Sequence, residues 1–162
     1  MLLATFFGEA QERCKTVDEG FRITIPQDWA RQDLHPIDSN AGSYVGETAD
    51  LEFDEAFFLG GRPKRSNGAV KTLKKKERNP KLLKPGEEVW HVDGRIAHFY
   101  NGKVDPEIYG QRRFTNVASL YIPYEGTSGY LSVFILYQSA ADLPIVRRAL
   151  KSIEWKKSPT NP

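Results

Sequence analysis

The chain has little cysteine, with Cys14 the only one among 162 residues. A single cysteine cannot form an intramolecular disulfide bond, so the cysteine content assigns no redox compartment. Long hydrophobic runs are also missing, since none approaches the roughly 20 apolar residues that a transmembrane helix needs. The apolar start, residues 1–10, is short and has no basic leader. It is compatible with the trimmed end of a signal sequence, and so with the cell envelope or periplasm, or with a short helix over residues 2–14 of a cytoplasmic protein.

Signatures of common enzyme classes are missing as well. The stretch FLGGRPKRSNG, residues 58–68, lacks the spacing of a phosphate-binding loop. No local signature links Cys14 to a histidine, so we do not expect a catalytic thiol. The three histidines are His35, His91 and His98. The sequence therefore indicates no catalytic residue and no cofactor, and we expect a protein without enzymatic activity.

Two carboxylates occur at strand spacing in ADLEFDEAFF, residues 49–58, where Glu52 and Asp54 alternate with Leu51 and Phe53. A strand with this alternation buries the two apolar side chains and places both carboxylates on its other face. A general acid and base pair would need one of the two carboxyl groups to be desolvated. We interpret the pair as the solvated face of a half-buried strand.

What is present is the composition of an ordinary globular domain. The sequence is 40% hydrophobic and 12% aromatic, which separates it from disordered chains. Its length suits one domain, which we place at residues 1–156, with a flexible tail at 157–162. Within that domain, residues 60–85 form a basic loop and helix that we interpret as an insertion.

Hydrophobic periodicity predicts strands and helices along the chain. FRITIP, residues 21–26, alternates apolar and polar side chains and ends at a proline, as a strand does. YLSVFILY, residues 130–137, is nearly continuously apolar, which favours a central strand covered on both faces. A further strand is expected within residues 111–122. Helical spacing predicts one helix within residues 66–80 and another at 142–153.

The clearest turn signal is Asp93-Gly94, within EEVWHVDGRIAHFY at residues 87–100. These two residues tolerate positive φ and predict a hairpin with a two-residue turn. In that register Trp90 lies opposite Ala97 on one face. The other face carries Val89, His91, Ile96, His98 and Tyr100.

His91 and His98 are then diagonal neighbours, roughly 7–8 Å apart between their backbones. Two imidazoles and a carboxylate such as Glu87 could share a metal ion, although a half-polar sheet face beside Tyr100 explains the same pattern. With Tyr100, the two histidines also mark a candidate pocket for a small ligand or for an enzymatic reaction on the sheet face.

Three stretches resemble the PsbP/Mog1-like domain family. FRITIPQDWARQD, residues 21–33, is similar to the opening of these domains, where an apolar strand runs into Pro-x-x-Trp. YLSVFILYQSAADLPIVRRALKSIEW, residues 130–155, is similar to their closing strand and helix, and WHVDGRIAHFY, residues 90–100, to their middle hairpin. The resemblance implies an α+β fold, an α/β/α sandwich in which helices flank an antiparallel sheet.

The resemblance also bears on function. Known members of this family include extrinsic subunits of the photosynthetic oxygen-evolving complex, a Ran-binding nuclear transport factor and many bacterial envelope proteins. They act by binding partners, and the resemblance supplies no catalytic residues for this chain. Fold alone does not specify function, so the partner has to be inferred from a site.

The strongest charge feature lies in residues 62–84, which carry net +9. Because the whole chain carries +2, the remainder carries −7, and such a dipolar arrangement can orient a charged partner. We call the cations of this segment the basic region. They are Arg62, Lys64, Arg65, Lys71, Lys74, Lys75, Lys76, Arg78, Lys81 and Lys84.

The basic region has two interpretations, a solvated helix face or a contact surface. As a contact surface it suits an acidic protein partner, or an anionic membrane with Leu73, Leu82 and Leu83 as shallow anchors. Nucleic acid is the least favoured partner, because the stretch has no interleaved aromatic residues and the rest of the domain is acidic. We therefore expect a non-enzymatic binding or accessory module.

Overall fold

The computed structural model describes residues 13–33, 40–56 and 64–155. All structural statements concern these residues, so residues 2–12 of the expected N-terminal helix, Arg62 and the tail at 157–162 lie outside them. Cys14, the last residue of that expected helix, begins a strand instead, paired across the small sheet with Pro26. The elements in chain order are β1 (Cys14–Asp18), β2 (Phe21–Pro26), β3 (Ala30–Gln32), β4 (Asn40–Val45), β5 (Ala49–Ala56), α1 (Lys64–Arg78), a 3₁₀ turn (Pro80–Leu82), β6 (Glu87–Val92), β7 (Arg95–Lys103), α2 (Pro106–Tyr109), β8 (Asn116–Pro123), β9 (Tyr130–Tyr137), a 3₁₀ turn (Ala140–Asp142), α3 (Leu143–Lys151) and β10 (Glu154–Trp155).

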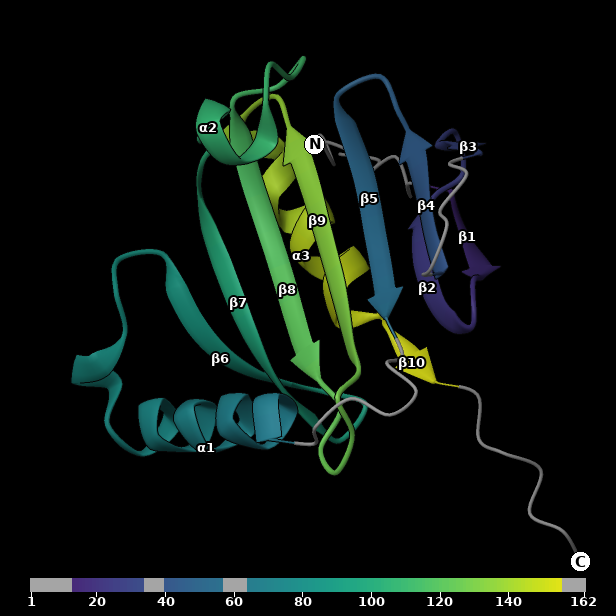
Figure 1. Ribbon diagram of the computed structural model, residues 1–162. Coiled ribbons are helices and arrows are strands. Elements are labelled where there is room, and N and C mark those ends of the chain that lie inside the picture. The colour runs from purple at the N-terminus through teal and green to yellow at the C-terminus, as the bar shows by residue number, and fades with distance from the viewer. Residues whose placement is uncertain (1–12, 34–39, 57–63, 156–162) are drawn as a thin grey trace, which may run out of the picture.

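The strands form two antiparallel sheets. A seven-stranded sheet has the order β3-β4-β5-β9-β8-β7-β6, and a three-stranded sheet has the order β1-β2-β10. Figure 1 shows α3 behind β8 and β9, and α1 below the ends of β6 and β7. α3 packs on β2, β8 and β9, whereas α1 packs on β6, β7 and β8. The architecture is the predicted α+β class, an antiparallel sheet flanked by helices.

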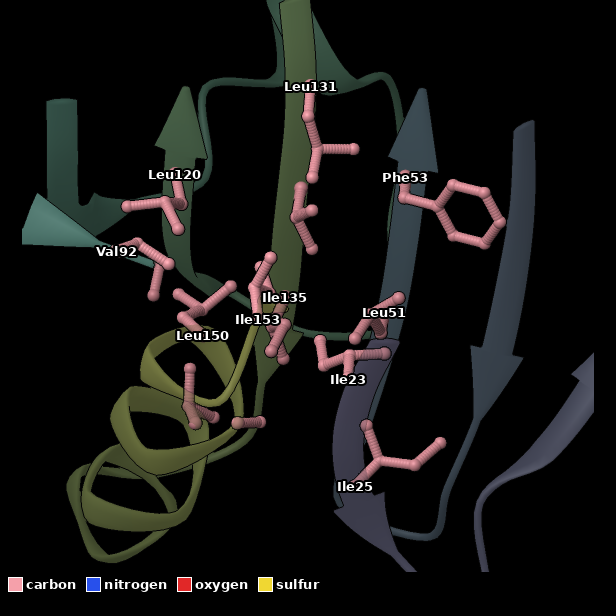
Figure 2. Close-up of a cluster of buried hydrophobic side chains, with 14 of the residues drawn as sticks. Ile23, Ile25, Leu51, Phe53, Val92, Leu120, Leu131, Ile135, Leu150 and Ile153 are labelled. Atoms are coloured by element: carbon pink, nitrogen blue, oxygen red, sulfur yellow. The ribbon is translucent and has the colours of Figure 1, made fainter. Parts of the chain in front are cut away.

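The main core lies between the seven-stranded sheet and the layer made by α3 and β2. Figure 2 shows Ile135 of the sheet beside Leu150 of α3 and Ile153, which follows that helix, with Leu120 and Leu131 farther along the sheet. All five side chains are fully buried or nearly so, and each such side chain contributes about 1.5–3 kcal/mol to folding. Side chains alternate between the two faces of each strand, so every second residue contributes an apolar side chain to this core.

The opposite face of the seven-stranded sheet is only partly covered. Glu52 and Asp54 lie there, half-buried, as their spacing predicts. Arg112 is paired with Glu52, and Arg113 Nη2 lies 2.7 Å from Asp50 Oδ1. Glu52 is therefore a member of a surface ion pair, which agrees with the interpretation of a solvated strand face. Asp54 differs, because one of its oxygens accepts from the Tyr130 hydroxyl at 3.1 Å and the other is buried without a hydrogen bond from any described residue.

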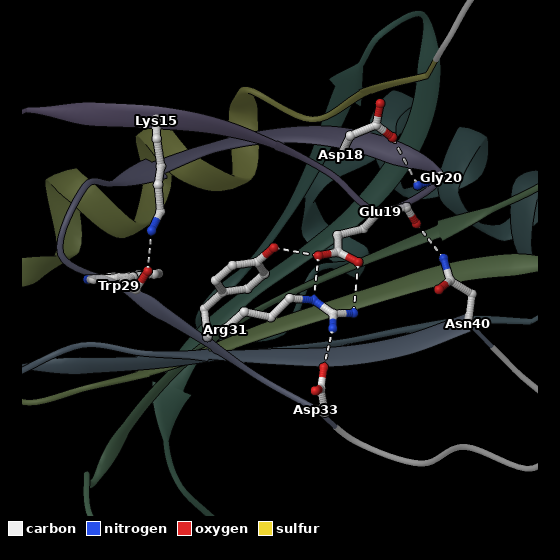
Figure 3. Close-up of polar contacts among 9 residues, drawn as sticks. Lys15, Asp18, Glu19, Gly20, Trp29, Arg31, Asp33 and Asn40 are labelled. Atoms are coloured by element: carbon white, nitrogen blue, oxygen red, sulfur yellow. Dashed lines mark hydrogen bonds and ion pairs between the residues drawn. The ribbon is translucent and has the colours of Figure 1, made fainter.

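A polar cluster ties the small sheet to the edge of the large one (Figure 3). Glu19, in the turn between β1 and β2, accepts two hydrogen bonds from Arg31 of β3, at 2.7 and 3.0 Å. The Tyr44 hydroxyl of β4 also donates to Glu19, and Arg31 donates to Asp33 at 2.6 Å. The pKa of Arg31 is raised, chiefly by its hydrogen bond to Glu19, and burial raises the pKa of the Tyr44 hydroxyl. Both groups keep their protons at neutral pH.

The predicted hairpin has the predicted register. Trp90 pairs with Ala97 across β6 and β7, and His91 pairs with Ile96. Asp93 and Gly94 have φ values of 47° and 76°, which is the backbone of a two-residue turn with both central residues at positive φ.

One strand boundary differs from the sequence prediction, and the cap of α3 has its own hydrogen-bond pattern. The eighth strand begins at Asn116 and not near residue 111, because Phe114 turns inward and packs against Val117 and Leu136. Asp142 is the N-cap of α3, but its carboxylate accepts from the Ser139 backbone N–H at 2.8 Å and makes no hydrogen bond to the helix itself. No described helix is both long and apolar enough to cross a membrane.

Candidate functional site: the basic helix and the cleft beneath it

α1 is amphipathic, and its inner side docks on the sheet. Val70 and Leu73 are buried against Ile96 of β7 and Val89 of β6. Near the helix start, Ser66 is buried and its hydroxyl donates to the Gly129 carbonyl at 2.9 Å. These contacts fix which helix face points to solvent.

The outward side of α1 carries a stripe of cations. Lys71, Lys75 and Arg78 are spaced i, i+4 and i+7, so they lie on one face, and all three are exposed. Lys81 and Lys84 continue the exposed positive charge past the end of the helix. In the described chain, no carboxylate lies within ion-pair distance of these five residues. We call these five residues the cationic stripe.

The other cations of the basic region have different environments. Lys74 Nζ lies 3.4 Å from Glu125 in an exposed pair, and Lys76 Nζ donates to Glu87 Oε2 at 2.8 Å in a half-buried one. Arg65 is exposed at the start of α1, which Lys64 opens. Leu73, an expected membrane anchor, is buried beneath the helix at 5% exposure, whereas Leu82 is 41% exposed.

Glu87 connects the helix, the following loop and the sheet. One of its oxygens accepts from Lys76 and from the Lys84 backbone N–H at 3.0 Å, and the other lies 3.4 Å from His98 Nε2. The hydrogen bond from Lys76, followed by that from Lys84, lowers the pKa of Glu87 to about 2. Glu87 is therefore ionised at neutral pH and holds α1 against β6.

The two histidines point to different partners. His91 is exposed and pairs with Glu77 of α1, whereas His98 is half-buried beneath the helix and faces Glu87. Burial lowers the pKa of His98, so its imidazole is neutral at pH 7. Among the described residues, no group of three or more His, Cys, Asp or Glu side chains is placed to hold a metal ion.

Tyr100 lies on the same sheet face but turns away from the histidines. Its ring covers the backbone of Gly102, where an added Cβ would lie 2.1 Å from the Tyr100 hydroxyl oxygen. It packs with Phe114, Val117 and neighbouring apolar side chains. The three residues of the predicted pocket are thus on one face, as their register requires, and the cleft that His98 lines includes neither His91 nor Tyr100.

A cleft of about 230 Å³ opens between α1 and the sheet. The sequence does not predict this cleft. Its floor joins His98 of β7 to Tyr121 of β8, and these residues meet only because their strands pair in the sheet. The helix side is mostly small or apolar. The lining residues are Ala69, Thr72, Leu73, Lys76, His98 and Tyr121.

Cys14 begins β1 and is exposed, without a disulfide bond. It lines a separate hollow of about 180 Å³ beside α3, with Thr24, Arg148 and Ser152 but with no histidine among the lining residues. A nucleophilic thiol needs an adjacent base or another group that stabilises the thiolate. The lining residues of this hollow include the cation of Arg148 but no general base, and His35 lies outside the described residues.

No protein-family model matches the chain, and no curated protein matches it. Solved structures, in contrast, match the chain in fold. A crystal structure from Bacteroides thetaiotaomicron VPI-5482 superposes with a TM-score of 0.53 at 10% identity, covering 86% of this chain and 46% of that one. The solution structure of cyanobacterial PsbP (CyanoP) from Synechocystis sp. PCC 6803 superposes with a TM-score of 0.51 at 11% identity, covering 95% and 99%. The chain thus spans about half of the Bacteroides chain and nearly all of CyanoP, and its PsbP-like fold confirms the resemblance seen in the sequence.

Proposed function

We propose that this PsbP-like domain is a non-enzymatic binding module that docks an acidic protein partner through its basic region. One observation carries the proposal. Glu52 and Asp50 of the large sheet are paired with arginines, whereas the cationic stripe has no carboxylate within ion-pair distance in the described chain. Such a stripe retains its charge for an external partner and speeds the encounter with it.

The support beneath the stripe favours a specific contact. α1 is held by buried apolar side chains and by the Lys76–Glu87 pair, so its outer side chains project from a fixed backbone. A preorganised surface loses less conformational entropy on binding than a flexible loop does. Leu82, exposed between Lys81 and Lys84, adds an apolar contact of the kind that protein interfaces contain.

Other polyanions fit the stripe less well. The stripe contains no aromatic side chain on which a nucleic acid base could stack, and the −7 charge of the remaining chain repels a long polyanion. An anionic membrane keeps only Leu82 as a well-exposed anchor, because Leu73 is buried. We therefore favour a compact acidic protein surface over a membrane or a nucleic acid.

The test compares the protein with a stripe variant, Lys71→Gln, Lys75→Gln, Arg78→Gln. A matched control, Arg22→Gln, Lys103→Gln, Arg148→Gln, removes the same charge from other elements. Binding to a short oligomer of poly-L-glutamate, to vesicles of phosphatidylglycerol and to duplex DNA is measured at about 50 and 200 mM salt, where screening weakens exposed charge contacts.

We expect poly-L-glutamate to bind the parent protein and the control, and to bind the stripe variant at least tenfold more weakly at 50 mM salt. Equal loss in the two variants would mean that net charge alone is responsible, and it would overturn the proposal. Stronger binding to vesicles or to DNA than to poly-L-glutamate would reassign the stripe to that partner class. The absence of binding to all three probes would leave the stripe as a solvated face and would also count against the proposal.

A further inference from the structure

The cleft beneath α1 is separate from the cationic stripe, because it opens on the other side of the helix. Its walls are Ala69, Leu73 and the carbon atoms of Thr72, and its floor is the pair His98 and Tyr121. The Tyr121 ring lies 5.6 Å from the ring of Tyr130, the first residue of β9, measured between ring centroids. The aromatic surface at the floor therefore continues from β8 to β9. An apolar cleft with a few convergent polar groups is the usual form of a small-molecule site.

The two polar groups on the floor of the cleft differ in their contacts within the described chain. His98 Nε2 is buried, and its nearest carboxylate oxygen, Glu87 Oε1, lies 3.4 Å away without hydrogen-bond alignment. The Tyr121 hydroxyl makes no hydrogen bond within the described chain. A ligand with a hydrogen-bonding group can therefore pair with the Tyr121 hydroxyl without displacing a protein contact.

The charges around the cleft cancel. Lys76 is neutralised by Glu87, which is 12% exposed and also holds the Lys84 backbone. Burial lowers the pKa of His98 and raises the pKa of Tyr121, so both rings are neutral at pH 7. An anionic ligand would compete with Glu87 for Lys76, and a cationic ligand would meet Lys76 without a free carboxylate in the cleft. The site favours a neutral molecule.

We propose that the cleft between α1 and the sheet binds a small neutral molecule that carries a ring and a hydroxyl, N–H or amide group. The ring lies against Ala69, Leu73 and the Tyr121 ring, and the polar group hydrogen-bonds to the Tyr121 hydroxyl. The volume of about 230 Å³ is smaller than the 300–1,000 Å³ of sites for drug-sized ligands, so it suits one or two fused rings.

The experiment is a titration of the full-length ¹⁵N-labelled protein with phenol and with indole, followed by NMR. Benzoate and benzylamine serve as anionic and cationic probes of similar size. We expect saturable shifts at Ala69, Thr72, Leu73 and Tyr121 for phenol or indole, with a Kd on the order of 1 mM, as ligands with so few atoms bind weakly.

Two matched variants test the position. Ala69→Phe fills the cleft and should abolish the saturable shifts, whereas Gly68→Phe, one residue earlier, places the same ring where an added Cβ meets no other atom within 4 Å. Gly68→Phe should therefore bind the probes as the parent does. Tyr121→Phe keeps the ring and removes the hydroxyl, and we expect a loss of about three- to tenfold in affinity for phenol.

Three results would overturn the inference. They are the absence of saturation with both neutral probes, unchanged binding in a folded Ala69→Phe variant, and equal or tighter binding of benzoate or benzylamine. If Ala69→Phe does not fold, unchanged affinity in Tyr121→Phe decides against the site. The stripe variant described above should bind phenol and indole normally, which separates this inference from the docking proposal.

Discussion

At the scale of single residues, Arg147 of α3 shows how one side chain can join two layers. It donates to both oxygens of Glu88 on β6, at 2.8 Å each. Its guanidinium also lies 5.0 Å from the centroid of Trp90 and 4.8 Å from that of Phe99, whose rings stack at 4.0 Å. The hydrogen bonds from Arg147 lower the pKa of Glu88, which keeps the pair ionised.

Replacing Arg147 with Met should lower the free energy of unfolding by about 1–2 kcal/mol, because the ion pair and the cation–π contacts are lost while the alkyl stem is kept. The Glu88→Gln variant should lose less, since the cation–π contacts remain. Urea unfolding of both variants and of the double variant gives the coupling between the two residues. Strictly additive losses would contradict the pairing.

The lowered pKa of Glu87 predicts that the stability of the fold depends on pH. The pKa of Glu87 in the folded protein, about 2, lies below the ordinary value of 4.5. Its ion pair therefore contributes fully above pH 4.5, and the contribution is lost as the pH falls from 4.5 towards 2. We expect Glu87→Gln to be less stable than the parent by about 1–2 kcal/mol at pH 7, with the difference shrinking steadily at pH 4, 3 and 2.

Glu125→Gln is the control for this series, because Glu125 forms an exposed pair with Lys74. Exposed pairs contribute little, so the control should differ from the parent by about 0.5 kcal/mol or less at each pH. Urea unfolding at the four pH values supplies both curves. A constant difference for Glu87→Gln across the range would rule out the assigned ionisation.

At the scale of an element, the hairpin of β6 and β7 depends on glycine at both of its ends. Gly94 in the turn has φ +76°, and an added Cβ there would meet no other atom within 4 Å. Gly86, just before β6, has φ +83°, and an added Cβ would lie 2.2 Å from the Asn101 carbonyl oxygen. The Asn101 backbone N–H donates to the Gly86 carbonyl at 2.9 Å, so β7 leaves no space at that position.

We expect Gly94→Ala to cost about 1–2 kcal/mol, because only the backbone conformation is unfavourable for a side chain. Gly86→Ala should cost clearly more, since it adds a collision with main-chain atoms to the same backbone cost. Thermal and urea unfolding of the two variants would measure the difference. Equal losses would show that β7 moves freely away from residue 86.

Some strands and helices were predicted from the sequence and others were not. The strand at Phe21–Pro26, the hairpin and α3 were predicted because alternation, a turn dipeptide and helical spacing are local signals. β3 was not predicted, because Ala30–Gln32 is exposed throughout and carries no burial pattern. Short edge strands of this kind are specified by their neighbour, here β4, and not by their own residues.

The candidate site was predictable only in part. The cations of α1 are visible in the sequence, and helical spacing assigns Lys71, Lys75 and Arg78 to one face. The cleft was not predictable, because Tyr121 reaches His98 through the pairing of β7 with β8, which depends on the whole sheet. For the same reason the sequence placed Tyr100 beside the histidines and could not show that its ring covers Gly102.

At the scale of the whole molecule, Trp155 of β10 joins the small sheet to the tip of the hairpin. Its backbone N–H donates to Asp93 at 2.8 Å, and its indole N–H donates to the Tyr124 hydroxyl at 3.1 Å. The Arg95 guanidinium lies 4.4 Å from its ring centroid. The half-buried Trp155 therefore contacts residues of both sheets.

Replacing Trp155 with Ala should lower the free energy of unfolding by about 2–3 kcal/mol, less than for a fully buried aromatic. The neighbouring Glu154→Ala removes only an exposed ion pair with Arg22 and should cost about 0.5 kcal/mol or less. Urea unfolding of both variants makes the comparison. Similar small losses in the two would show that β10 adds little to the fold.

The pairing of β2 with β10 also has a consequence for synthesis. Phe21 lies opposite Trp155, so two neighbouring strands of one sheet are far apart in the sequence and are synthesised at different times. While the ribosome adds the residues between them, β2 can pair with β1 but has only one of its two neighbours. The apolar face of β2, with Ile23 and Ile25, stays without α3 until that helix has left the exit tunnel. During synthesis this layer is therefore completed only after α3 and β10 have emerged, long after β1 and β2.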